Sequence, residues 1–358
     1  MISFRNHDNR TVEFSPGLNV IWGENGSGKT SILEAIYSLS IGRSFRTSDR
    51  KQMIQKEKDY FRIVGKFEAQ GSKSNVAMSQ LKDGRRKITF NDETVKGFRN
   101  FVGRNPVVLL SPEEQGITKG VPAERRMFFD KLFSIASHDY FEALTEFNRV
   151  LKQRNSALSA VKEGHQSSAS IHPWNEPLAD CAQRIWEMRE NLWGKYSKHL
   201  KEVLQKLNDN SVDLEGLYSS KTLTSKEDFL ITLEKNERRD IALQRTMSGP
   251  QKDDYSFLFN NEDIRQFGSQ GEHKLALILI KLAEFKFIQE LNDTTPIILL
   301  DDVLAKLDFH RSEVVMALLE KNVQTIITTT NLVNVESHGI DVKNTNNMSL
   351  YLERPCSN

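Results

Sequence analysis

Eight residues near the start of the chain constrain its fold more than any other stretch. Residues 23–30 read GENGSGKT and fit the pattern G-x-x-x-x-G-K-[ST] of a phosphate-binding loop, or P-loop. Glycines let the backbone curl until successive N–H groups point into one concavity, which suits an anion. Residues 18–22 read as a short buried strand, and the apolar residues behind the loop recur at helical spacing. The sequence therefore predicts a strand, a phosphate-binding loop and a helix in succession.

The same motif predicts what its side chains do. Lys29 can reach the β- and γ-phosphates of a nucleotide, and the Thr30 hydroxyl can ligate Mg²⁺. The dipole of the following helix adds to anion binding at its first turn. The residues expected to bind the nucleotide are Gly23, Glu24, Asn25, Gly26, Ser27, Gly28, Lys29, Thr30 and Ser31.

Composition limits the kind of protein that this chain can be. Its 358 residues are enough for two structural units, and 38% hydrophobic and 27% charged residues describe an ordinary protein with a core. Because there is no run of 18 apolar residues and no signal-peptide pattern, we expect a cytoplasmic location. A net charge of +1 does not by itself indicate a nucleic-acid partner, and the cysteines and histidines show no metal-ligand spacing.

The character of the chain changes twice along its length. Residues 1–112 are rich in strand signals and suggest an antiparallel meander after the P-loop helix. Residues 113–240 lose those signals and show helical periodicity, with two long helices joined near 164–170 and the second starting near Asn175. Residues 241–358 return to α/β character. We therefore predict an ATPase domain in two parts, separated by a helical insertion domain.

A second motif, PIILLDD at residues 296–302, is an apolar strand that ends in two acids. A Walker B element has this pattern, because its strand carries an acid to the edge of the sheet where the phosphates lie. Asp301 would hold Mg²⁺ directly or through water, and Asp302 would polarise the water that attacks the γ-phosphate. We expect this strand to lie beside the P-loop strand. The metal ligands would then be Thr30 and Asp301.

A third motif occupies the start of an apolar helix. Ser269, Gln270, Gly271 and Glu272 resemble the signature of ABC-type ATPases, which grips the γ-phosphate bound to the opposite subunit. The alternative is local, because Ser269 and Glu272 also form an S-x-x-E capping box that needs no nucleotide. Both interpretations can hold, since a capped helix start is also an anion site.

Two weaker motifs follow the Walker B strand. Residues 304–308, LAKLD, resemble an ABC D-loop that would place Asp308 at a dimer interface, although they could equally begin an ordinary helix. Thr330 stands in the segment where ABC proteins usually place a switch histidine. Its hydroxyl could touch the γ-phosphate or the attacking water, but it is a poorer proton acceptor than imidazole. This favours slow hydrolysis, with Lys29, Asp301, Asp302 and Thr330 as the catalytic residues.

The order of these motifs identifies an ABC/SMC-type head, and the residues between them resemble the RecF family of bacterial DNA replication and repair ATPases. The matching stretches are FRNH at 4–7, GENGSGKTSILEAIYSLSIGRSFRTS at 23–48, LSPEEQGITKGVPAERRMFFD at 110–130, LKQRNSAL at 151–158, SGPQKDD at 248–254, FGSQGEHKLALILIKLAE at 267–284 and ILLDDVLAKLD at 298–308. The resemblance implies an α/β fold, an ABC-type P-loop ATPase head with a mixed sheet and an inserted α-helical domain. Gln251, Lys274 and Lys306 depart from the family pattern, and the first strand looks shortened.

The resemblance also implies a function. ATP and Mg²⁺ would bind the P-loop of one subunit, and Ser269 of a second subunit would close on them in an ATP-dependent homodimer. The dimer would bind single-stranded and double-stranded DNA at gap junctions and hydrolyse ATP weakly. With RecO and RecR it would aid RecA loading, replication restart and the SOS response.

Local charge offers candidates for DNA contact, namely Arg125, Arg126, Lys152 and Arg154. The alternative is that these side chains lie on solvated faces or form ion pairs, because acids are interspersed among them. Two other functions also fit a P-loop. A transport ATPase subunit lacks support because the switch histidine is absent, and a clamp that never hydrolyses ATP is disfavoured by Asp301 and Asp302 together.

Overall fold

The computed structural model describes residues 1–69, 71–97, 101, 103–207, 209, 211–220, 225–292, 294–302, 323–331 and 347–353. Contacts within the chain divide it into two compact units. One consists of residues 1–115, 205–208 and 270–358, and we call it the P-loop unit. The other consists of residues 116–204 and 209–269, and we call it the helical unit.

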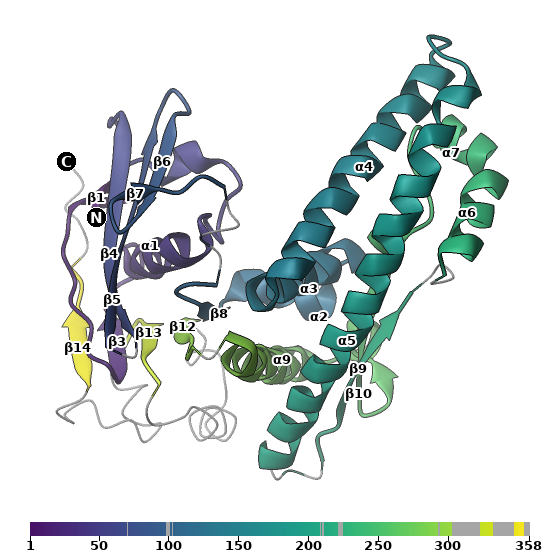
Figure 1. The fold of residues 1–358 in the computed structure, drawn as a ribbon. Coiled ribbons are helices and arrows are strands. Elements are labelled where there is room, and N and C mark those ends of the chain that lie inside the picture. The colour runs from purple at the N-terminus through teal and green to yellow at the C-terminus, as the bar shows by residue number, and fades with distance from the viewer. Residues whose placement is uncertain are drawn as a thin grey trace. The chain divides into compact units, whose positions relative to one another are not determined.

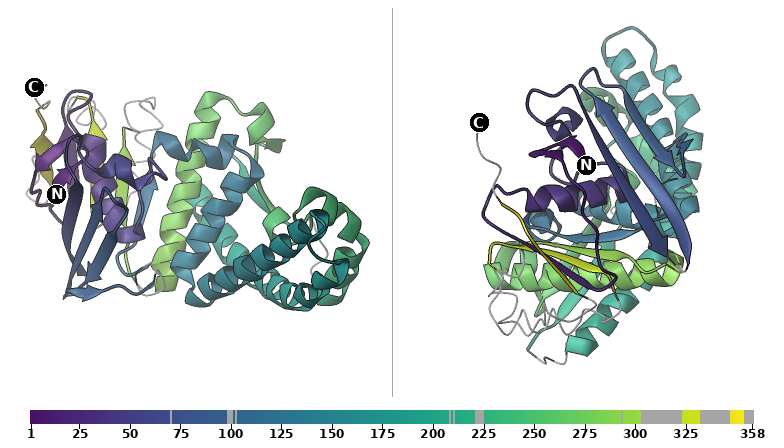
Figure 2. Two further views of the ribbon diagram at one scale, coloured as in Figure 1. Left: turned by 90° about the horizontal axis from the view of Figure 1, so that it is seen from above. Right: turned by 90° about the vertical axis from the view of Figure 1, so that its left-hand side faces the viewer.

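A parallel sheet forms the centre of the P-loop unit. Its described strands lie in the order β14 (Met348–Tyr351), β3 (Leu18–Trp22), β13 (Thr325–Thr329), β12 (Ile297–Asp301) and β8 (Val107–Leu110). Helix α1 (Lys29–Ile41) packs on one face of this sheet and α9 (Gln270–Asn292) on the other (Figure 2). Because both faces are covered, the middle strands β3, β13 and β12 are buried along nearly their whole length.

The order of these strands corrects one expectation. Strand β13 pairs with β3 on one side and with β12 on the other, so the Walker B strand does not lie directly beside the P-loop strand. The crossovers between parallel strands set this order, and no local pattern records it. As a result, a strand rich in threonine separates the two motifs, and Thr328 is in register with Asp301.

A second sheet in the P-loop unit is antiparallel, as the meander prediction required. Its order is β2 (His7–Asn9), β1 (Ile2–Phe4), β4 (Tyr60–Ala69), β5 (Ser72–Leu81), β6 (Arg86–Phe90) and β7 (Glu93–Thr94). The short β1 pairs with β4 only at Ile2 and Arg62, so β2 forms the sheet edge. Short 3₁₀ turns lie at Arg50–Met53 and Pro112–Gln115. The core under this sheet contains Phe4, Ala35, Leu39, Met53, Phe61, Ile63, Val76, Met78 and Phe101.

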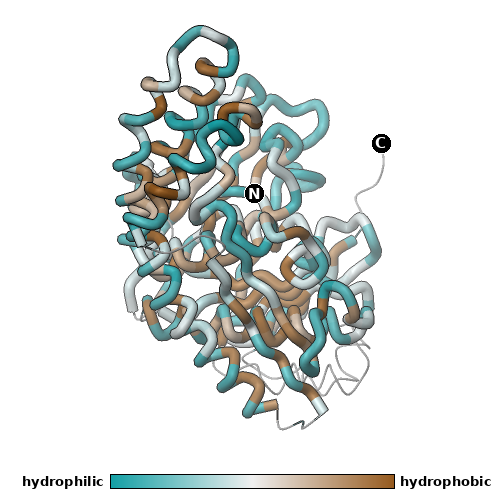
Figure 3. The backbone as a smooth tube through the Cα atoms, turned by 90° about the vertical axis from the view of Figure 1, so that its right-hand side faces the viewer, coloured by the Kyte–Doolittle hydropathy of each residue, from teal (hydrophilic) through white to brown (hydrophobic). Residues whose placement is uncertain are grey.

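The helical unit is built around a long hairpin of two helices. Helix α4 (His138–Lys162) and helix α5 (Asn175–Leu207) run antiparallel (Figure 1), and α5 begins at the residue predicted from the sequence. The other helices are α2 (Gly116–Lys119), α3 (Pro122–Ala136), α6 (Lys226–Lys235), α7 (Glu237–Leu243) and α8 (Ile264–Phe267), with 3₁₀ turns at Ser168–Ser170, His172–Trp174 and Pro250–Lys252. Hydrophilic and hydrophobic residues alternate along the helices (Figure 3). No helix in the described ranges is long and apolar enough to cross a bilayer.

A small sheet shows where the predicted boundaries differ from the observed ones. Strand β9 (Leu214–Ser219) lies in the segment predicted to contain no strands, and it pairs along its length with β10 (Asp254–Phe259). Strand β11 (Glu262–Asp263) completes the sheet. Because β10 needs β9 as its partner, the chain stays in the helical unit past the predicted boundary at 240/241 and returns to the P-loop unit only after Ser269. The first division falls after Gln115 rather than after residue 112.

Candidate nucleotide and magnesium site

The loop between β3 and α1 has the conformation that its glycines allow. Gly23, Gly26 and Gly28 have φ angles of 148°, 86° and 98°, in the region where side chains are disfavoured. A Cβ on Gly23 would lie 2.3 Å from the carbonyl oxygen of Leu352, and one on Gly28 would lie 2.6 Å from the His7 ring. Glycine is therefore required at both ends of the loop for conformation and for space.

Lys29 begins α1 and is buried against the loop. Its Nζ donates hydrogen bonds to the carbonyl oxygens of Gly23 at 2.7 Å and Glu24 at 2.8 Å. Burial lowers the pKa of Lys29, while the charges of Asp302 and Asp301 act in the opposite direction. The ammonium is thus held by neutral carbonyls instead of a paired carboxylate. A side chain held in this way can turn to a phosphate without breaking an ion pair.

Three oxygen atoms meet where β12 ends. The Thr30 hydroxyl donates to Asp301 Oδ1 at 2.9 Å, and the Thr328 hydroxyl donates to the same oxygen at 2.7 Å. Burial raises the pKa of Asp301, and the hydrogen bonds from Thr328 and Thr30 partly offset that rise. The P-loop threonine and the Walker B aspartate, far apart in sequence, are therefore in direct contact.

Asp302 has an unusual backbone conformation for a residue with a side chain. Its φ is 52°, and its N–H donates to the Thr328 hydroxyl at 3.0 Å. Its Oδ1 is buried and has no hydrogen-bond partner within the described part of the chain. A buried carboxylate oxygen without a partner is costly, so such atoms are usually satisfied by water or a ligand.

These residues fit a magnesium ion bound together with a nucleotide. Mg²⁺ is usually held by one or two protein oxygens while phosphates and waters complete its octahedron. Thr30 Oγ1 and Asp301 Oδ1 are two such oxygens at 2.9 Å from each other. The described residues contain no cluster of three or more His, Cys, Asp or Glu that would form a cage made of protein alone. The donor set therefore suits a metal that arrives with phosphate groups.

A threonine of β13 that the sequence analysis did not select also lies at the site. The predicted residue, Thr330, is exposed beyond the end of the strand, and its contact with the γ-phosphate or the attacking water stays a prediction. Thr328 occupies the position in register with Asp301 and bonds to both Walker B acids. Side chains alternate between the faces of a strand, and three consecutive threonines do not reveal which of them points to the site.

Residues from the N-terminal FRNH stretch support the loop, a role that the sequence analysis did not assign. Asn6 Nδ2 donates to the Gly26 carbonyl oxygen at 3.1 Å, and His7 Nε2 lies 3.1 Å from the Gly28 carbonyl oxygen. Arg5 forms an ion pair with the buried Glu34 of α1. The signal available in the sequence was the match of FRNH at 4–7 to the family pattern.

The signature residues stand where α9 begins. Gln270 is the first helical residue, Ser269 precedes it and is exposed, and Gly271 and Glu272 lie in the first turn. The predicted helix start is therefore confirmed. The role of Ser269 toward the nucleotide of a second subunit stays a prediction, and Asp308 of the D-loop lies outside the described residues.

Arg125 does not have the solvent-facing position that the DNA-contact prediction required. Only 4% of its surface is exposed. Its guanidinium donates to the Gly120 carbonyl oxygen at 2.8 Å, to Asp254 at 3.0 Å and to the Tyr255 carbonyl oxygen. The prediction is wrong for this residue, because its hydrogen-bonding groups hold α3 to β10.

Arg154 is also a buried structural residue, so the prediction is wrong here too. It lies on α4 with no exposed surface. Its Nη1 donates to Asp240 at 2.8 Å and to the Thr246 hydroxyl at 2.7 Å, and its Nε donates to Asn175 at 2.9 Å. Its partners lie 21 to 92 residues away in sequence, so the local charge pattern could not reveal them.

The other two basic candidates remain predictions. Lys152 is exposed on α4. Arg126 is half-buried, and its Nη1 donates to the Asp253 carbonyl oxygen at 2.7 Å. Burial, together with the charge of Arg189, lowers the pKa of Arg126.

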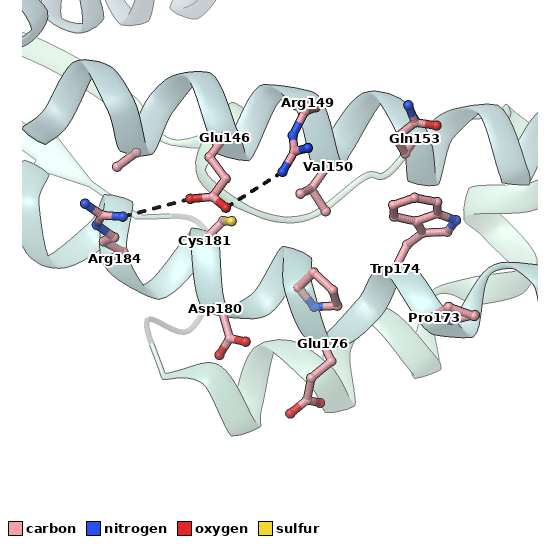
Figure 4. A pocket seen from close by; sticks show the side chains of 12 residues that line it. Glu146, Arg149, Val150, Gln153, Pro173, Trp174, Glu176, Asp180, Cys181 and Arg184 are labelled. Atoms are coloured by element: carbon pink, nitrogen blue, oxygen red, sulfur yellow. Dashed lines mark ion pairs between the residues drawn. The ribbon is translucent and has the colours of Figure 1, made fainter.

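A separate groove of about 770 Å³ lies between α4 and α5 (Figure 4). Val150 and Trp174 line it, and Glu146 forms ion pairs at 3.9 Å with Arg149 and Arg184 at one end. None of the residues predicted to bind nucleotide or metal lines this groove. It is therefore not the site that the motifs define.

Fold and site together define an ABC-type P-loop ATPase head, as the motifs predicted. The model of the "RecF/RecN/SMC N terminal domain" family matches residues 1–349. The "DNA replication and repair protein RecF" of Clostridium perfringens (strain SM101 / Type A) is 32% identical over 341 residues, which cover 94% of this chain and 93% of that protein. The chain therefore belongs to the RecF/RecN/SMC N-terminal domain family and, within it, to the RecF proteins.

Solved structures lead to the same fold. One, described as "the recombination mediator protein RecF-ATPrS in RecFOR pathway", is 29% identical with a TM-score of 0.84, covering 93% of this chain and 91% of that one. An Smc head bound to the C-winged helix domain of ScpA is 18% identical with a TM-score of 0.53, covering 94% of this chain and 89% of that one. The second likeness concerns the fold alone. The predicted fold class, an α/β head with an inserted helical domain, is confirmed.

Proposed function

We propose that this protein is an ATP-controlled DNA-binding protein of DNA replication and repair. The contact of Thr30 and Thr328 with Asp301 behind the P-loop carries the proposal. It supports a site for a nucleoside triphosphate with Mg²⁺ in a chain similar over nearly its whole length to proteins named for DNA replication and repair. The likeness to a solved RecF structure named with an ATP analogue supports ATP as the nucleotide.

The residues of the site divide the work of hydrolysis among them. Lys29 would bind the β- and γ-phosphates, and Thr30 and Asp301 would hold Mg²⁺. When bound, Mg²⁺ neutralises and polarises the phosphate oxygens. Asp302 would orient the attacking water through its Oδ1, which is buried without a described partner. The Thr328 hydroxyl donates to Asp301 and accepts from the Asp302 N–H, so it offers no free base, which supports weak ATPase activity.

We further propose that ATP joins two copies of the chain. Ser269, Gln270, Gly271 and Glu272 of one copy would contact the γ-phosphate held by the other, with Asp308 at the same interface. The dimer would bind single-stranded and double-stranded DNA at gaps, act with RecO and RecR in loading RecA, and support SOS induction in the cytoplasm. These roles are proposed from the family resemblance and from the position of Ser269 at the start of α9.

The decisive experiment measures the size of the protein in solution with ATP, with ADP and without nucleotide, each with and without gapped DNA. We expect dimers and tighter DNA binding with ATP only. If ATP changes neither dimerisation nor DNA binding, the proposal is wrong.

Ser269→Ala separates the signature role from a simple helix cap. We expect the variant to bind ATP normally and to dimerise less, because the hydroxyl acts on the partner's nucleotide. Ser225→Ala is the matched control, since Ser225 caps α6 by accepting from the Asp228 N–H. Undisturbed ATP-driven dimerisation of Ser269→Ala would show that Ser269 only caps its helix.

A further inference from the structure

Four basic side chains gather on the helical unit, where the chain passes from α7 to β10. They are Arg126, Arg239, Arg245 and Lys252, and we call them the cationic patch. Arg126 comes from α3 and Arg239 from α7, while the other two flank the connecting loop. Arg126 Nη1 donates to the carbonyl oxygen of Asp253, the residue after Lys252, at 2.7 Å. Gln251, the residue before Lys252, donates to the carbonyl oxygen of Thr246, next to Arg245, at 3.2 Å. The Arg245 N–H donates to the carbonyl oxygen of Asp240, next to Arg239, at 3.1 Å. These hydrogen bonds between neighbouring residues therefore bring the three arginines and Lys252 into one region of the helical unit.

The loop that carries Lys252 is held firmly on both sides of that residue. Gln251 Nε2 donates to the Ser248 carbonyl oxygen at 2.7 Å and closes the loop from within. Asp253, on the other side, is fully buried and accepts from Arg189 Nη1 at 2.7 Å. Lys252 lies between these two anchored neighbours in a 3₁₀ turn and is only half-buried. Its position is therefore set before any ligand arrives.

The acids near the patch in sequence already have partners in the fold. Asp240, Asp253 and Asp254 each form an ion pair with a buried arginine of the fold. Within the described ranges, no carboxylate lies within ion-pair distance of Arg239, Arg245 or Lys252, and Arg239 and Arg245 are exposed. Clustered cations raise one another's free energy, and a bound anion lowers it again.

We propose that the cationic patch binds the phosphate backbone of DNA, without reading base sequence. This proposal rests on the proposed function, which makes DNA the partner of the chain. The cations come from α3, α7 and the loop before β10, and Arg239 and Arg245 are exposed. This spread suits successive phosphates of a strand better than a single enclosed anion. The patch takes the role that sequence analysis gave to Arg125 and Arg154, whose guanidinium groups bond to the fold.

The test is a triple variant with Arg239→Ala, Arg245→Ala and Lys252→Ala, measured by the binding of a fluorescent gapped duplex over a range of salt concentrations. Arg126 is left in place because it bonds to the Asp253 carbonyl oxygen. Each lost phosphate contact should lower the slope of log affinity against log salt by about 0.9, so we expect a decrease of about 2 to 3 and at least a roughly tenfold weaker affinity at physiological salt.

Two further variants exclude simpler explanations. Lys195→Ala with Lys201→Ala removes exposed charges from α5 outside the patch and should leave the slope unchanged. Lys252→Arg keeps the charge and should keep the affinity. Thermal unfolding and ATP binding, measured in parallel, should be unaffected because the exposed members of the patch make no described ion pair.

The outcomes separate this inference from the proposed function. If the triple variant keeps the salt slope of the unaltered protein, or if the Lys195 and Lys201 variant loses as much slope, the cationic patch does not bind DNA. This holds whether or not ATP affects DNA binding. If the triple variant has a smaller salt slope and ATP has no effect on DNA binding, the cationic patch is supported and the proposed control of DNA binding by ATP is wrong. If the unaltered protein does not bind DNA even at low salt, both proposals are wrong.

Discussion

The nucleotide site of the P-loop unit and the surroundings of Arg189 in the helical unit treat buried charge in opposite ways. In the P-loop unit, Lys29 rests on two carbonyl oxygens, and Asp302 Oδ1 has no described partner. In the helical unit, Arg189 donates to Asp253, to Asp130, to the Pro250 carbonyl oxygen and to the Tyr140 hydroxyl. A charged group that binds a ligand keeps hydrogen-bonding capacity for that ligand, whereas the charge of Arg189, which holds the fold together, is bonded to several protein groups.

The largest expected effect is on the stability of the helical unit, where Arg189 is hydrogen-bonded to the groups named above. Arg189→Met should destabilise the protein by about 3–5 kcal/mol, because it leaves the buried Asp253 and the half-buried Asp130 without their cation. Urea unfolding followed by tryptophan fluorescence measures this change, since Trp174, Trp186 and Trp193 all belong to the helical unit.

Arg184→Met is the matched control on the same helix. Arg184 is exposed and its ion pair with Glu146 spans 3.9 Å, so its loss should cost less than about 1 kcal/mol. Equal destabilisation by the two variants would show that the network around Arg189 is not what holds the helical unit together.

The next largest effect is on ATP hydrolysis, through the carboxylate of Asp302. Asp302→Asn should slow hydrolysis roughly a hundredfold while ATP still binds, because the amide cannot orient and deprotonate water as the carboxylate does. Asparagine tolerates the positive φ of 52° at this position, so the backbone should be preserved. Single-turnover hydrolysis is the measurement, and a prolonged ATP-bound dimer is expected. A turnover rate equal to that of the unaltered protein would exclude Asp302 as the water-orienting acid.

Lys29→Ala tests the nucleotide site by its affinity for ATP. ATP affinity should fall roughly ten- to hundredfold, because a charged hydrogen-bond donor to phosphate is lost. The free energy of unfolding should not fall, since Lys29 bonds only to carbonyl oxygens and its charge is desolvated. Titration with a fluorescent ATP analogue measures the affinity, with exposed Lys73→Ala in the same unit as control. Unchanged affinity would refute the role assigned to the P-loop lysine.

The smallest effect compares two threonines of the β13 segment. Thr328→Val should cost about 1 kcal/mol and raise the pKa of Asp301 further, because the Thr328 hydroxyl lowers that pKa. A protonated Asp301 cannot hold Mg²⁺. As the pH is lowered, the variant should therefore lose its affinity for Mg²⁺ with ATP at a higher pH than the unaltered protein does. Thr330→Val should change neither property. A larger effect from Thr330→Val would mean that the register in the structure does not describe the working site.

Short sequence patterns predicted those parts of the fold that depend only on residues close together in the sequence. The P-loop conformation, the helix that starts at Asn175 and the helix after Ser269 follow from glycine spacing, turn residues and apolar periodicity. Strand β9 was missed because only one of its residues, Leu214, is fully buried, which leaves little hydrophobic signal.

The sequence by itself determined that this chain binds phosphate between a strand and a helix and that an acidic strand end accompanies that loop. These motifs need only neighbouring residues, and a family resemblance spanning them extended the prediction to the whole fold. Only the tertiary structure decided which threonine meets Asp301, which strand separates the two motifs and which arginines remain accessible. Register, strand order and burial depend on partners as far as 329 residues apart, and no window along the chain contains them.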